Sequence, residues 1–260
     1  MKKILIVVVL FSCAIAGCKK VKTISYAGVF KLNKQILSDG RWDTTWMKEQ
    51  AKIYTDRHYM YAGLSTDSDV RFGFGTYEIG PNQTVVEHNI FNYKALDSAQ
   101  VFVVQMKQSA NALTAIVPDW ARSKTTGYKL TEEYAKVQSS GTSALDGVWE
   151  LDKQYLVKGR DTTRQRETLF KIFWQGHFML IRHYPVDPVA TKYKNGFGYG
   201  KFTLKNNTLD ETMEMSSQKA LVNKKLTIPV DLKSNEYTEE FKDPKSQLQT
   251  IAIYKRIRVN

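Results

Sequence analysis

The residues best suited to chemistry are one lysine, one histidine and one glutamate, which recur in the same order in each half of the chain. The two sets are Lys52, His58 and Glu87, and Lys171, His177 and Glu211. Each set brings together a cation, a base and an acid that could form a buried polar cluster. These six residues are the candidate ligand-binding residues, and we expect none of them to be catalytic.

The carboxylate of the second set is expected to point into the protein. Because side chains alternate along a strand, Glu211 shares a face with an otherwise apolar row, Leu209, Met213 and Met215. A buried carboxylate is costly unless it is paired or hydrogen-bonded, which makes His177 or Lys171 its candidate partner. We expect Glu211 to meet His177, and Glu87 to meet His58 in the same way.

Two roles are open for such a pair. It could be a polar anchor inside a ligand cavity, since pockets commonly combine an apolar lining with a few placed polar groups. Alternatively, it could be a structural hydrogen bond that closes one end of a barrel filled by side chains. The recurrence of the residues in both halves fits either role.

Sequence motifs of catalysis and metal binding are absent. None of the four histidines has a His-x-x-x-His or Glu-x-x-His spacing, and the sequence contains no Gly-x-Ser-x-Gly elbow and no phosphate-binding loop. No predicted helix follows the glycine-rich run 196–200, so strand bending accounts better for its glycines. We therefore expect no enzymatic activity, no metal and no cofactor.

The chain contains a long internal repeat. Residues 27–35, Ala-Gly-Val-Phe-Lys-Leu-Asn-Lys-Gln, recur at residues 146–154 as Asp-Gly-Val-Trp-Glu-Leu-Asp-Lys-Gln. Matches continue to the end of both copies, with small changes of offset that loop insertions explain. The segment between the copies, residues 138–144, is small and polar, as in a flexible linker. We predict two domains, residues 23–137 and 145–260.

Both copies are predicted to be all-β, because short β-branched and aromatic runs alternate with turn residues. In the first copy we expect eight strands near residues 26–35, 47–55, 58–64, 71–79, 83–93, 100–107, 111–117 and 127–137, and the second copy runs in parallel. Closure into an antiparallel barrel would remove the exposed sheet edges. A barrel of eight strands is just wide enough to be filled by side chains or to hold one small ligand.

Short motifs link the copies to a known family. The second copy carries Gly147-Val148-Trp149, Lys171-Ile172, His177-Phe178, Thr208 with Glu211, and Tyr254-Lys255-Arg256-Ile257. With these motifs each copy resembles the small lipocalin-like, calycin-type domains of bacterial envelope lipoproteins. It departs from their pattern where Tyr254 replaces a closing tryptophan, and the first copy departs further with Phe30 at the opening one. The resemblance implies a lipocalin-like barrel and, by analogy alone, the carriage of small apolar molecules.

Residues 1–17 are predicted to be a lipoprotein signal peptide. Met1-Lys2-Lys3 precedes an apolar run that is too short to span a bilayer, and Ile15-Ala16-Gly17-Cys18 resembles the lipobox of bacterial lipoproteins. That resemblance implies cleavage before Cys18, lipid attachment to it, and a tether over residues 18–22. Lysine instead of aspartate after the cysteine favours the outer membrane. The lack of an acidic run there favours its periplasmic face.

Composition limits the classes of function. The net charge is +12, but the basic residues are dispersed among the predicted strands, so we expect no nucleic-acid partner. The leading expectation is a membrane-anchored binding module for a small apolar ligand or an envelope protein. The alternative is a non-catalytic accessory or structural subunit of an outer-membrane assembly. An enzyme, such as a hydrolase or isomerase, is the least favoured class.

Overall fold

The computed structural model describes residues 25–94, 100–118, 128–186, 192–242, 246 and 248–258. The predicted signal peptide, the lipid attachment site Cys18 and the tether lie outside these residues. The described part is built of strands, with two short 3-10 turns at Pro81–Gln83 and Lys219–Leu221. Within it, no helix is long and apolar enough to cross a membrane.

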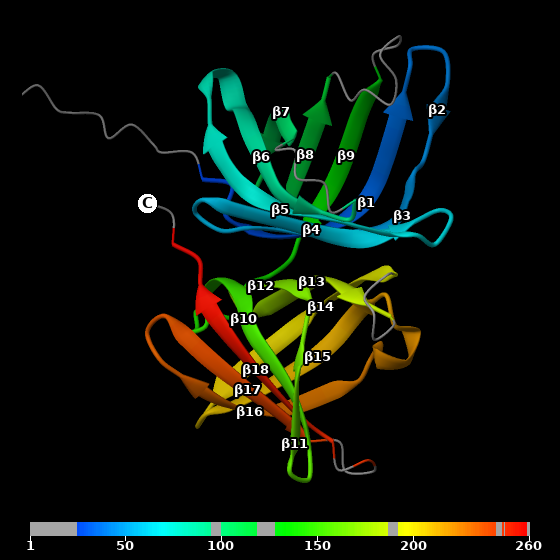
Figure 1. Cartoon of the computed structure of the whole chain (residues 1–260). Coiled ribbons are helices and arrows are strands. Elements are labelled where there is room, and N and C mark those ends of the chain that lie inside the picture. Colours follow the sequence, from blue (N-terminus) through cyan, green and yellow to red (C-terminus); the bar gives the residue numbers. More distant parts are fainter. Residues whose placement is uncertain are drawn as a thin grey trace, which may run out of the picture.

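The first half forms one closed antiparallel barrel, which we call barrel 1 (Figure 1). Its strands follow one another in sheet order, except that the two-residue β2 pairs with the end of β1. Strand β9 pairs back onto β1 and closes the barrel. The strands are β1 (Gly28–Ser38), β2 (Asp43–Thr44), β3 (Met47–Tyr54), β4 (His58–Ser65), β5 (Val70–Ile79), β6 (Thr84–Asn92), β7 (Gln100–Gln108), β8 (Ala112–Val117) and β9 (Lys129–Lys136).

The second half repeats this topology as barrel 2. Strand β11 extends β10 as a hairpin, and β18 pairs with β10 to close the barrel. The strands are β10 (Gly147–Lys158), β11 (Asp161–Gln165), β12 (Thr168–Trp174), β13 (His177–Pro185), β14 (Tyr193–Lys205), β15 (Thr208–Ser216), β16 (Lys225–Leu232), β17 (Glu236–Lys242) and β18 (Gln249–Arg256). The predicted fold class, two consecutive eight-stranded antiparallel barrels, is confirmed; the hairpin strands β2 and β11 are additional.

The two barrels pack face to face, through β4 and β5 of barrel 1 and β13 and β14 of barrel 2 (Figure 1). Residues on the outer faces of these strands and of their neighbours form one apolar cluster, in which the ring of Phe170 in β12 lies 4.7 Å from that of Phe74 in β5 and 5.2 Å from that of Phe91 in β6. At the edge of the cluster, the Asn195 amide donates a hydrogen bond of 2.7 Å to the carbonyl of Tyr93. We call this contact the barrel interface.

This interface explains why some strands are buried on both faces. In β3, Lys52 and Tyr54 point into barrel 1, whereas the alternate residues Ala51 and Ile53 belong to the interface cluster. All four are buried. Strand β12 repeats the pattern, with a buried Lys171 between Phe170 and Ile172. Inward and outward residues can therefore be assigned from strand parity even where both are apolar.

A bulge at the same place in each barrel depends on glycine. Between Tyr199 and Gly200 the register of β14 against β15 shifts by one residue, and the equivalent shift occurs at Gly75. A Cβ atom on Gly200 would lie 1.9 Å from a backbone carbonyl oxygen of the facing strand, so no other residue fits. The bulge also corrects one expectation: Met215 lies in the barrel interface and not on the inward row with Glu211.

The segment between the barrels has defined contacts. Within residues 138–144, the backbone N–H of Ser140 donates a hydrogen bond of 3.1 Å to the carbonyl of Gln175, in the turn between β12 and β13. At its end, the Arg256 guanidinium donates to the carbonyl of Ala144. The segment predicted to be a flexible linker therefore follows the surface of barrel 2.

Candidate functional site

In barrel 1, the predicted lysine and glutamate form a buried ion pair. Lys52 Nζ lies 2.7 Å from Glu87 Oε1, and both side chains are about 95% buried, with 5% and 6% of their surface exposed. The hydroxyl of Tyr54 also donates a hydrogen bond to Glu87. Lys52 Nζ lies 5.0–5.8 Å from the ring centres of three tyrosines, Tyr54, Tyr59 and Tyr61. These contacts compensate the cost of burying both charges.

In barrel 2, the equivalent lysine pairs with two carboxylates. Lys171 Nζ lies 2.8 Å from Glu211 and 2.6 Å from Glu239, and the Tyr237 hydroxyl donates a further hydrogen bond to Glu239. Burial alone would lower the pKa of Lys171, but the two carboxylates outweigh it and the pKa rises. Burial raises the pKa of Glu211, and the charge of Lys171 only partly opposes that shift. Each charged group of this cluster has an ion-pair partner among the protein's own residues.

The histidines do not join these clusters, so the expected pairs of Glu211 with His177 and of Glu87 with His58 are wrong. His58 lies on the outer face of β4, and its ring stacks on that of Phe74 with 5.9 Å between the ring centres. His177 stacks on Tyr199 at 6.2 Å. Phe74 and Tyr199 both belong to the barrel interface. Strand parity is the reason: each histidine lies six residues after its lysine, across a turn that reverses the chain and leaves the imidazole on the outer face. Burial lowers the pKa of both histidines.

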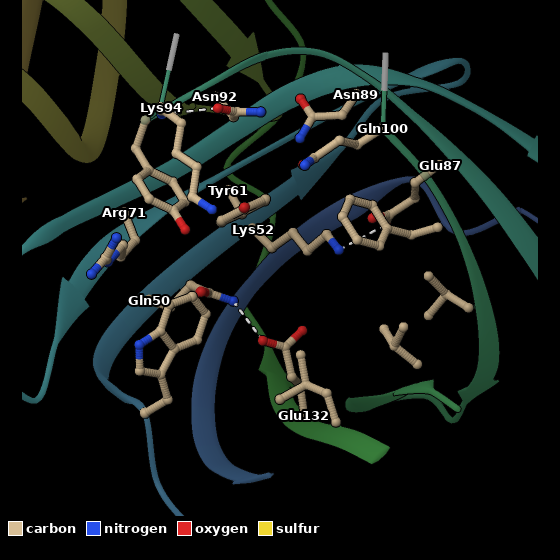
Figure 2. Close-up of a pocket in the computed structure, with 16 residues that line it drawn as sticks. Gln50, Lys52, Tyr61, Arg71, Glu87, Asn89, Asn92, Lys94, Gln100 and Glu132 are labelled. Carbon is tan, nitrogen blue, oxygen red and sulfur yellow. Dashed lines mark hydrogen bonds and ion pairs between the residues drawn. The ribbon is translucent and has the colours of Figure 1, made fainter. Parts of the chain in front are cut away.

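Barrel 1 contains a cavity of about 390 Å³, and the Lys52–Glu87 pair forms part of its lining (Figure 2). Its apolar walls are Tyr61, Phe102, Val104, Val117 and Leu130, and its polar lining is Gln50, Lys52, Glu87, Asn89, Asn92, Gln100 and Glu132. Trp46, Arg71, Tyr93 and Lys94 complete the lining. A volume in this range suits a small molecule and exceeds what one or two waters need.

Glu132 is the acidic residue of this cavity that the sequence did not single out. It is 7% exposed and accepts hydrogen bonds from the amides of Gln35 and Gln50 at 2.9 and 3.1 Å, and from the Tyr134 hydroxyl at 2.8 Å. No lysine, arginine or histidine in the described ranges forms an ion pair with it. Glu132 is thus a buried carboxylate held by neutral donors beside open space.

Asn89 also presents an unpaired group. Its side chain is 5% exposed, lines the cavity, and its Oδ1 atom has no hydrogen-bond partner within the described part of the chain. A buried carbonyl oxygen without a donor costs free energy, and native proteins have few of them. A ligand or water that donates a hydrogen bond to Oδ1 would remove that cost.

Barrel 2 is filled at the positions where barrel 1 is hollow. The interior there packs Trp149, Phe173, Phe178, Phe202, Tyr237 and Tyr254 together with aliphatic side chains. Strand pairing aligns Gln50 with Leu169, Asn89 with Met213 and Glu132 with Ala252, so three polar cavity residues become apolar in barrel 2. The two clusters therefore differ in their surroundings: that of barrel 2 lies in a packed interior, and that of barrel 1 borders a cavity.

The mouth of the cavity carries positive charge next to aromatic rings. The Arg71 guanidinium lies 4.5 Å from the ring centre of Tyr93 and 5.4 Å from that of Trp46, and it pairs with the exposed Asp69 at 2.9 Å. Lys94 Nζ lies 5.8 Å from the same ring of Tyr93. An anionic group entering here would meet two cations.

In the part of the chain that the structure describes, no group of three or more histidine, cysteine, aspartate or glutamate side chains could hold a metal ion.

Comparisons with solved structures concern the fold alone. The chain is similar to a lipocalin-like protein from Bacteroides uniformis, with 19% sequence identity and a TM-score of 0.29, over 44% of this chain and 100% of that one. It is also similar to a protein of unknown function from the DUF3598 family of Nostoc punctiforme, with 10% identity and a TM-score of 0.29, over 89% of this chain and 96% of that one. Neither a protein-family model nor a curated protein matches the chain.

Proposed function

We propose that this chain is a binding protein that holds one small ligand in the cavity of barrel 1. The observation that carries the proposal is the contrast within a single chain. Two barrels of the same topology keep the same buried Lys–Glu pair, but barrel 1 alone replaces core side chains by Gln50, Asn89 and Glu132 around open space. A cavity in place of a packed core destabilises a barrel. The presence of such a cavity in barrel 1 therefore favours a functional reason for it.

The lining favours a polar ligand over the apolar one that the family resemblance suggests. Nine of the lining side chains are polar or charged: Gln50, Lys52, Arg71, Glu87, Asn89, Asn92, Lys94, Gln100 and Glu132. A purely apolar ligand would leave Glu132 and Asn89 without water and without new partners, which is unfavourable. Barrel 2 is proposed to act as a structural partner, since its interior is filled and its outer face covers β3, β4 and β5.

We further propose that the protein acts from a membrane surface, through a lipid on Cys18, in the outer membrane and facing the periplasm. This rests on the Ile15-Ala16-Gly17-Cys18 sequence and the lysines after it. A tethered carrier of this kind would capture a small solute close to the membrane and needs no catalytic residues.

The test is a binding experiment with a cavity-blocked control. Isothermal titration calorimetry would use the mature protein without its lipid and a panel of dipeptides, monosaccharides, nucleosides and fatty acids. The control is Gln50→Leu with Asn89→Met, which gives barrel 1 the residues that barrel 2 has at these positions. At least one probe should bind the wild type and lose that binding in the control. Equal binding to both proteins would place the site elsewhere and contradict the proposal.

A further inference from the structure

We infer that the ligand of barrel 1 is a small zwitterion of the amino-acid or short-peptide kind, with its ammonium group against Glu132 and its carboxylate towards Arg71 and Lys94. This rests on the proposed binding function and adds the chemical class of the ligand. The two barrels differ in where the acid beside the buried Lys–Glu pair lies.

The first step is the position of the second acid. Both barrels hold a buried lysine paired with a glutamate, Lys52 with Glu87 and Lys171 with Glu211, and each has a second glutamate nearby, Glu132 in barrel 1 and Glu239 in barrel 2. Barrel 2 has a further acid, Glu167, which pairs with Arg182. In barrel 2, Lys171 contacts Glu211 and Glu239 directly. In barrel 1, the second acid, Glu132, lies one strand further along the barrel, out of ion-pair contact with Lys52. Both the Lys52–Glu87 pair and the hydrogen-bonded Gln50–Glu132 pair line the cavity, and they lie apart in Figure 2.

The second step is the charge that this space requires. Glu132 accepts hydrogen bonds from neutral donors only, so its negative charge is compensated less than that of Glu239, which has Lys171 at 2.6 Å. In a site of low dielectric constant, a cation is attracted strongly to such a carboxylate. A ligand ammonium group would supply the cation that Lys171 supplies in barrel 2, and it has three N–H donors for Glu132 and the acceptors around it.

The third step is the opposite end of the ligand. In the view of Figure 2, Lys94 and Asn92 lie on the other side of the cavity from Glu132, with Arg71 at its edge. These cations favour a ligand carboxylate, which an arginine can bind with two parallel hydrogen bonds. The walls between the ends, Tyr61 and Phe102 among them, suit an aliphatic or aromatic side chain. A ligand with one ammonium and one carboxylate group would match both ends of the cavity.

The experiment compares five probes by calorimetry: glycyl-leucine, its N-acetyl form, its C-terminal amide, glucose and palmitate. Glycyl-leucine should bind, and the N-acetyl form should bind at least tenfold more weakly because it has lost the cation. Glu132→Gln should weaken glycyl-leucine at least tenfold. The matched control is Glu239→Gln, which removes the buried acid of barrel 2 and should leave the affinity unchanged.

A second variant keeps the proposal testable if Glu132→Gln does not fold. Lys94 is exposed, and Lys94→Gln should weaken glycyl-leucine without weakening its amide, because the amide has no carboxylate to lose. Equal affinity for glycyl-leucine and its N-acetyl form would overturn the zwitterion. Binding of glucose or palmitate alone, abolished in the Gln50→Leu/Asn89→Met control, would also overturn it while leaving the proposed binding function intact.

Discussion

Glu132 lies directly opposite Ala115 across β9 and β8, and in barrel 2 the same pair of positions holds Ala252 and Glu239. The acid and the alanine have thus exchanged strands between the two barrels. A second exchange occurs at the mouth, where Gly63 faces Arg71 in barrel 1 and Arg182 faces Gly196 in barrel 2. In each case the cross-strand pair keeps one large and one small member, so its volume is conserved. The two barrels differ in which strand of the pair carries the charged residue.

The first prediction follows from these aligned positions. Asn89→Met should raise the free energy of unfolding, by about 1–3 kcal/mol, because it removes a buried carbonyl oxygen that has no donor. The same change should abolish ligand binding, since Met213 fills the equivalent place in barrel 2. Chemical denaturation and calorimetry on one protein sample measure both quantities. A variant that is destabilised would show that the Asn89 side chain has a structural partner.

The fold was predictable because its signals are local. Turn residues and strand alternation placed all eight barrel strands of the first copy within a few residues of the observed ones, and the repeat placed the second set. The choice of histidine as partner failed because strand parity was not followed through the turn between each lysine and its histidine. Lys52 and Lys171 were among the candidates and are the true partners.

The cavity was not predictable in the same way, because the residues shared by the two copies do not mark it. Its polar residues Gln50, Asn89 and Glu132 differ from their counterparts Leu169, Met213 and Ala252. The difference between copies was itself the signal: an inward polar residue opposite an apolar one marks a place where the cores diverge. The apolar barrel interface was also missed, since alternation cannot show what covers an outer face.

The second prediction concerns the structural cluster of barrel 2. Lys171→Met should destabilise the protein by about 3–5 kcal/mol, because it leaves two buried carboxylates without a cation. The loss should be smaller at lower pH, because burial raises the pKa of Glu211 and its carboxylate then takes up a proton more readily. Adding Glu211→Gln and Glu239→Gln should recover much of the stability. Denaturant titrations of the single and triple variants measure this, and a single variant as stable as the wild type would contradict the assignment.

The third prediction is a pH dependence from the two interface histidines. Burial lowers the folded pKa of His58 and His177 below the ordinary histidine value of 6.5, so the unfolded state binds more protons as the pH falls through that value. Stability should therefore decrease below about pH 6.5. The raised pKa of Glu211 acts in the opposite direction, because its contribution is lost as the pH rises above its unfolded value of 4.5.

A matched variant separates these two effects. His58→Gln with His177→Gln retains Glu211, so the difference between its pH profile and that of the wild type reports the histidines alone. The unfolding free energy of the variant should change less between pH 7.5 and pH 5.5. Identical profiles would show that neither imidazole is held neutral by the fold.

The fourth prediction concerns the membrane anchor. Cys18→Ser should prevent lipid attachment and cleavage at the lipobox, so the protein should retain its signal peptide and take up no labelled fatty acid. Metabolic labelling with palmitate, followed by mass spectrometry of the N-terminus, reads out both effects. Labelling of the variant at the wild-type level would exclude Cys18 as the attachment site.

The fifth prediction separates the autonomy of the barrels from their association. Each barrel closes its own sheet, so residues 23–137 and 144–260 should each fold alone and melt cooperatively. Each piece would then expose its half of the interface cluster, an apolar surface that favours association, and the two pieces should form a 1:1 complex when mixed. Phe170→Asp in the second piece should abolish the complex, because Phe170 packs on Phe74 and Phe91.

Ile79→Asp in the first piece is the control, since Ile79 is 42% exposed and lies outside the interface cluster. Analytical ultracentrifugation measures the association; pieces that stay monomeric when mixed would show that the interface depends on the covalent connection through residues 138–144.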